Sequence, residues 1–192
     1  MISKNKHFNS CSPFAFPLIC SSPPIQEQPQ SAFRAVNTAV EQNVTADVPV
    51  IPVLYPNKIF DLNNEYDPIT STFTPKQDGV YLIIASVNFF PDIVTSYRVL
   101  VLIRVNDVPV ASDNDFFGEI PIGDITSVSA ILPLKAGDTV NVAVSSSTDG
   151  TILSTAFASP THFEAARFPS PNGFHFLSAN NISTSTYNFS SI

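Results

Sequence analysis

The chain has 192 residues, 44% of them hydrophobic and only 13% charged, and its net charge is −7. The length suits one domain with a real core. The charged fraction is about half of the usual ~25%, which fits either an ordinary all-β domain or a domain that buries part of its uncharged surface in an oligomer. The acidic excess lies within residues 31–170, where no Lys/Arg cluster offers a surface to nucleic acid, and no apolar run reaches the ~18–20 residues of a membrane span.

Residues 1–30 form an N-terminal arm rich in Pro, Ser and Gln. Such a composition buries too little apolar surface to offset the entropy of ordering, so we expect the arm alone to be extended or disordered. The arm holds both cysteines, Cys11 and Cys20. They are either inert thiols or the partners of a local or intermolecular disulfide, and two thiols alone do not make a metal site.

The pattern changes at residue 31, where the predicted domain of residues 31–170 begins. In residues 31–40, Phe33, Ala35 and Asn37 fall on one face, which suits a strand, although a short helix also fits. Residues 48–55 favour β structure, but their prolines confine them to a sheet edge or a bulge. Further strands are predicted at residues 59–62, 69–73, 79–90, 96–105, 108–111, 128–134, 139–145, 152–156 and 161–168.

Turn-forming residues separate these strands, notably at 75–79, 106–107 and 135–138. Residues 112–124, SDNDFFGEIPIGD, are predicted to be an acidic loop. Short strands with frequent turns and no amphipathic helix predict an all-β fold, an antiparallel sandwich or barrel.

Residues 171–192 form a second compositional region, a polar and aromatic-dotted C-terminal tail. Two interpretations remain open for it. The tail is disordered, or it supplies a strand that docks on the edge of its own sheet or of a neighbour's sheet.

One stretch carries a recognisable signature. An aromatic residue is followed at fixed spacings by an acidic residue, a second aromatic residue, a Phe and a Gly-x-Tyr; these positions are Tyr55, Asp61, Tyr66, Phe73, Gly79 and Tyr81. The stretch resembles the signature of the C1q domain of the C1q/TNF-like superfamily. Residues 130–140 resemble the family's late strand–turn–strand, with Gly137 and Asp138 at the turn, and the similarity covers roughly residues 31–168.

The resemblance implies a jelly-roll sandwich of about ten strands that forms a homotrimer, with Tyr97 and Phe163 as candidate interface positions. It further implies a non-enzymatic structural or recognition module that is extracellular or surface-displayed. Bacterial relatives cap collagen-like filaments on spore surfaces. This chain has only six Gly and no Gly-X-Y period, so a partnership with another surface or filament protein would run through the two tails.

Two other functional classes compete with this one. The acidic loop offers Asp113, Asp115 and Glu119 as candidate Ca²⁺ ligands, but their spacing is not that of an EF-hand. A lectin-like or Ca²⁺-assisted ligand-binding module is therefore the alternative function, and no other cofactor is indicated. No nucleophile motif accompanies the histidines, so no enzymatic activity is expected.

Overall fold

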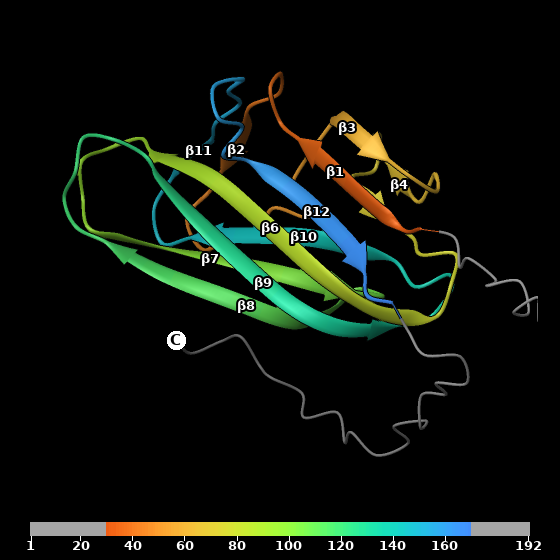
Figure 1. Ribbon diagram of the computed structural model, residues 1–192. Helices are drawn as coiled ribbons and strands as arrows, with labels where there is room; N and C mark the ends of the chain where they lie inside the picture. Colours follow the sequence, from red (N-terminus) through yellow and green to blue (C-terminus); the bar gives the residue numbers. More distant parts are fainter. Residues whose placement is uncertain (1–29, 170–192) are drawn as a thin grey trace, which may run out of the picture.

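The computed structural model describes residues 30–169, which form twelve β-strands and no helix. The strands build two antiparallel sheets that pack face to face (Figure 1). The predicted all-β antiparallel sandwich is therefore confirmed. The strand count exceeds the expected ten because several two- and three-residue pieces pair separately.

The larger sheet has seven strands and is organised around β6. Along its main path the order is β2 (Gln42–Val44), β11 (Gly150–Ile152), β6 (Gly79–Pro91), β12 (His162–Arg167), β1 (Ala32–Val36) and β3 (Asn57–Asp61). On the other side of β6, β9 (Asp124–Leu134) pairs with it over eleven residues without a register shift. The two strands run side by side along the length of the sandwich (Figure 1).

The smaller sheet has five strands. Their order is β4 (Tyr66–Asp67), β5 (Thr72–Phe73), β10 (Val140–Ser146), β7 (Tyr97–Val105) and β8 (Val108–Phe117). Residues 48–55 lie beside β10, where the Val53 amide donates a 2.8 Å hydrogen bond to the Val142 carbonyl. This position at the sheet margin is the one predicted from their prolines, since a proline has no N–H group to donate to a neighbouring strand.

Side-chain alternation along β6 determines which groups form the core. Its odd-numbered residues from Tyr81 to Phe89 are 0% exposed and point between the sheets, whereas the intervening even-numbered residues point outward. A strand has a two-residue side-chain period, so one strand supplies both the core and an outer surface.

An aromatic cluster fills one end of the core. The Phe33 ring stacks on Tyr66 at 4.5 Å and on Phe73 at 4.9 Å between centroids, and it meets Phe163 edge to face at 5.0 Å. These four residues come from four different strands. Such ring pairs add stabilisation beyond burial alone, and this cluster joins the two sheets.

Several predicted boundaries are wrong. Residues 112–117 belong to β8 and pair with β7, so the acidic loop begins only after Phe117. The strand predicted at residues 152–156 is instead β11, which ends at Ile152. Ile69, placed in a predicted strand, lies before β5 and is 87% exposed. In each case the extent of pairing with neighbouring strands, and not local composition, sets where the strand begins and ends.

Candidate assembly face

The outward surface of the seven-stranded sheet carries apolar side chains along part of β6 and β9. Val80, Leu82 and Ile84 of β6 point outward, and Leu82 lies directly opposite Ile131 of β9. Ile131 is 63% exposed, and Ile125 on the same side of β9 is 53% exposed. No helix covers this surface within residues 30–169, so the strands leave a row of apolar side chains in contact with solvent. We call this surface the assembly face.

The charged groups of the assembly face pair with one another. Arg34 of β1 and Glu164 of β12 are cross-strand partners, with Arg34 Nη1 2.7 Å from Glu164 Oε1. His162 Nε2 lies 3.4 Å from the same oxygen. Arg34, Glu164 and His162 therefore form one group of interacting polar side chains, and matched charges reduce the cost of covering them.

The centre of the face is built from small side chains. Ser127 of β9 donates a 3.0 Å hydrogen bond to Ser86 of β6, and Ser86 is 0% exposed. His162 lies opposite Ser86 in the ladder, but its Nδ1 lies 3.2 Å from the Ser159 carbonyl and its Nε2 faces Glu164. Both ring nitrogens thus have other neighbours, and the arrangement is not that of a serine nucleophile with its base.

The aromatic signature residues lie inside the sandwich and not on the assembly face. Tyr55, Phe73 and Tyr81 are 0% exposed, and Tyr66 is 4% exposed. Burial raises the pKa of Tyr55 well above its ordinary value, and the neighbouring Tyr66 adds to this increase. These side chains shape the core that supports the assembly face.

Asp61 is a cap for the segment that follows it. Its side chain is 2% exposed and accepts hydrogen bonds from the amides of Glu65 at 3.0 Å and Tyr66 at 3.1 Å. Burial by itself raises the pKa of Asp61, but these two amides and the Lys58 ammonium outweigh it and hold the pKa below its ordinary value.

The remaining signature residues occupy turns and a strand start. Gly79 opens β6. Gly137 has φ of +89°, which suits a residue without a Cβ. Asp138 accepts hydrogen bonds from the Lys135 amide at 2.7 Å and from Asn106 Nδ2 at 2.9 Å, so it links two neighbouring turns.

The interface prediction for Phe163 is wrong. Phe163 is 0% exposed and packs against Phe33 and Tyr55, so it has no surface to offer another subunit. Tyr97 is only 3% exposed, with its ring 5.1 Å from that of Phe117. Both aromatic side chains lie on the inward face of their strands, β7 for Tyr97 and β12 for Phe163, and β7 belongs to the sheet opposite the assembly face.

The predicted calcium ligands are not brought together. Asp113 and Asp115 lie on β8 opposite Val101 and Val99, and Glu119 follows the end of that strand. In the described part of the chain, no three His, Cys, Asp or Glu side chains form a group that could hold a metal ion. Extended backbone, in place of the expected loop, prevents these side chains from curling around an ion. Cys11 and Cys20 lie outside the described residues.

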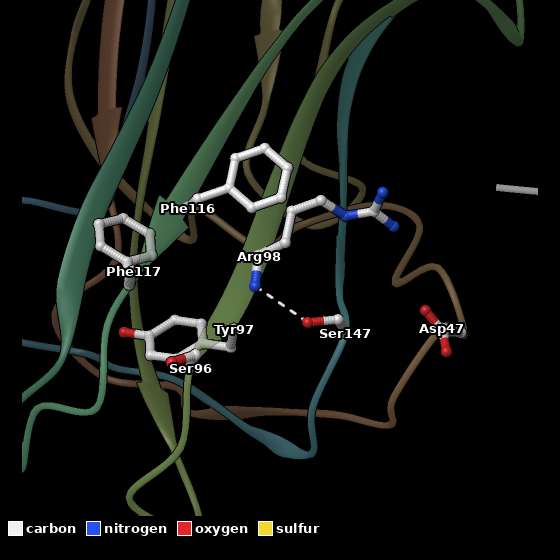
Figure 2. A pocket seen from close by; sticks show the side chains of 7 residues that line it. All are labelled: Asp47, Ser96, Tyr97, Arg98, Phe116, Phe117 and Ser147. Atoms are coloured by element: carbon white, nitrogen blue, oxygen red, sulfur yellow. Dashed lines mark hydrogen bonds between the residues drawn. The ribbon is translucent and has the colours of Figure 1, made fainter.

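The structure also contains a shallow hollow that was not predicted from the sequence. It lies where β7 begins and β8 ends, it has a volume of about 530 Å³, and it is lined by Asp47, Ser96, Tyr97, Arg98, Phe116, Phe117 and Ser147 (Figure 2). Counting outward from the two-residue turn at 106–107 places Phe116 beside the start of β7, so the pairing of this hairpin was an available signal.

The fold and the assembly face together define a jelly-roll sandwich. No helix of residues 30–169 covers the outer surface of its larger sheet. The model of the C1q domain family matches residues 32–164, and the chain belongs to this family. Domains of the family are typically trimeric recognition or structural modules without enzymatic activity, and they are often extracellular or surface-exposed. No curated protein matches the sequence significantly.

Solved structures show the same fold at low sequence identity. The globular domain of zebrafish complement 1qA is 18% identical, with a TM-score of 0.54 over 74% of this chain and 99% of that one. Murine APRIL at pH 5.0 is 12% identical, with a TM-score of 0.52 over 72% of this chain and 99% of that one. The described residues contain no helix long and apolar enough to cross a membrane.

Proposed function

We propose that this chain forms a homotrimer through the assembly face and acts as a non-enzymatic, surface-displayed structural and recognition module. The observation that carries the proposal is the uncovered apolar row of β6 and β9, where Ile131 is 63% exposed beside Leu82. Contiguous exposed apolar surface of this kind marks an interaction site. The self-paired charges of Arg34 and Glu164 can be covered without leaving an isolated charge.

Light scattering coupled to size exclusion tests the assembly. The full chain should elute with a mass of about 62 kDa, three times the 20.8 kDa of one chain. Ile131→Asp should shift the mass toward one chain, because a carboxylate would be desolvated in the contact. Ile93→Asp is the matched control, since Ile93 is 64% exposed in the loop between β6 and β7 and should tolerate the change.

Two results contradict the assembly proposal. One is a mass of a single chain for the unmodified protein at micromolar concentration. The other is a trimer that resists Ile131→Asp as well as Ile93→Asp, which would place the contact on another surface.

The location is the second part of the proposal. A spore or cell surface is proposed because C1q-type domains are often extracellular or surface-exposed, with the two tails as attachments to another surface or filament protein. Antibody raised against residues 30–169 should label intact cells or spores without permeabilisation. Labelling that requires permeabilisation contradicts surface display.

Ligand binding is a second candidate function. The hollow beside β7 and β8 favours it, because it groups an arginine, an aspartate and exposed aromatic surface in one concave area. Calcium assistance has no support in the geometry of Asp113, Asp115 and Glu119.

A further inference from the structure

Phe116 provides an uncovered aromatic platform at the rim of the hollow. It is 76% exposed, although it is paired within the β7–β8 ladder, directly opposite Arg98 and one residue from the end of β8. Figure 2 shows its ring beside the aliphatic part of the Arg98 side chain. The face of an aromatic ring is electron-rich, so this ring suits a partner that presents C–H groups.

The two charged side chains of the hollow lack protein partners. In the part of the chain that the structure describes, neither the Arg98 guanidinium nor the Asp47 carboxylate takes part in an ion pair or a hydrogen bond. They are not paired with each other, and in the view of Figure 2 both charged groups lie to the right of Ser147. Arg98 offers a fork of donors, and Asp47 offers two acceptor oxygens.

Ser147 adds a third polar group at a fixed position. Its Oγ accepts a 2.9 Å hydrogen bond from the Arg98 amide, and its own amide donates to the Arg98 carbonyl at 3.0 Å. The Ser147 hydroxyl therefore keeps a proton to donate into the hollow. Donor, acceptor and hydroxyl are held by the ends of β7 and β10 and by the loop that contains Asp47.

We propose that this hollow binds an uncharged saccharide. A sugar ring has an apolar face of C–H groups that can pack on Phe116. Its hydroxyls can donate hydrogen bonds to Asp47 and accept hydrogen bonds from Arg98 and Ser147. The lining carries one positive and one negative formal charge, so a singly charged ligand would be attracted by one of them and repelled by the other. The shallow shape and the volume of about 530 Å³ fit one or two sugar rings at the end of a chain.

The position of the hollow keeps it accessible. Arg98 and Phe116 lie on the outward side of the five-stranded sheet, and the assembly face is the outward side of the other sheet. If the proposed trimer forms, three such sites are displayed together, and weak single contacts add as avidity. Only this last point depends on the proposed function.

The test is binding of the full chain to a glycan array, followed by saturation-transfer NMR with the free saccharide of each positive spot. The expected result is binding to neutral saccharides, reduced at least tenfold by Phe116→Ala and by Arg98→Ala. Arg98→Lys should retain part of the binding, because an ammonium keeps the charge but loses the fork. Phe157→Ala is the matched control, since Phe157 is 88% exposed and does not line the hollow.

Three outcomes overturn the proposal. The first is an array without binding to neutral saccharides, and the second is binding that is unchanged by Phe116→Ala. The third is a stronger saturation-transfer signal from a zwitterionic amino acid, such as L-phenylalanine, than from every sugar. The NMR readout works on a single chain as well as on a trimer. A failed trimer and a failed saccharide site are therefore told apart.

Discussion

The hydroxyl of Tyr66 donates a 2.8 Å hydrogen bond to the backbone carbonyl of Tyr55. Tyr55 in turn donates its amide to Ser71 Oγ at 2.8 Å, and both tyrosines are buried. Two of the signature aromatics therefore do more than fill space. They fix the segment between residues 55 and 72, which contains β3 and β4, against the core.

Removing the Tyr66 hydroxyl should destabilise the protein without changing the fold. Tyr66→Phe leaves the Tyr55 carbonyl buried and without this donor, so we expect a loss of about 1–2 kcal/mol in the free energy of unfolding. Urea denaturation at fixed protein concentration measures this value. A change below about 0.3 kcal/mol would mean that the bond adds nothing net.

Two substitutions at Tyr81 distinguish the contribution of packing to stability from that of hydrogen bonding. It is 0% exposed, and its hydroxyl donates to the Gln77 carbonyl at 2.9 Å. We expect Tyr81→Ala to cost about 3–5 kcal/mol from the cavity it leaves, and Tyr81→Phe about 1 kcal/mol. Equal losses for the two variants, measured by urea denaturation, would contradict the view that the ring carries most of the stabilisation.

Asp61 should make stability depend on acid pH. Its pKa in the folded protein is below the ordinary value of 3.8, so the unfolded chain binds the proton more tightly. The stabilisation is fully present above about pH 5 and is lost as the pH falls through 3.8 and then through the folded pKa. Asp61→Asn should cost about 2 kcal/mol at pH 7, and this difference should shrink toward pH 2. A difference that is constant with pH would contradict the assignment.

Glu65 is a buried carboxylate that ties three segments together. It is 4% exposed and accepts hydrogen bonds from Ser31 Oγ, Asn63 Nδ2 and the Lys76 amide. Glu65→Ala leaves these donors unsatisfied, so we expect a loss of about 2–3 kcal/mol by urea denaturation. Glu119→Ala is the control, since Glu119 is exposed and should change stability by less than about 0.5 kcal/mol. Equal effects in both variants would rule out the proposed role.

Glu65 also makes a contact that could not be predicted from the local sequence. Asn63, Asn64 and Glu65 are polar residues of a kind common in turns, and Asn64 has a positive φ. Nothing local indicates that the Glu65 carboxylate turns inward to meet Ser31, which is 34 residues away. A contact over that separation depends on how β1 and β3 pair.

The inward face of a strand could not be assigned from the sequence for a similar reason. Alternation in residues 79–90 identifies two faces of one strand, but it does not say which of two apolar faces is inward. Leu82 and Ile84 are as hydrophobic as Ile83, and only the position of the second sheet leaves them outside. The same uncertainty led to the wrong interface assignment of Phe163.

The sequence by itself determined the signature stretch, and with it the fold. Spacing from Tyr55 to Tyr81, turn residues such as Gly137 and β-branched runs are local properties, and they are sufficient to identify a C1q-type sandwich. The tertiary structure decided which apolar side chains remain exposed, as at Ile131, and that Arg98, Phe116 and Asp47 surround one hollow. These are relations between distant segments, which form only when strand pairing and sheet packing bring the segments together.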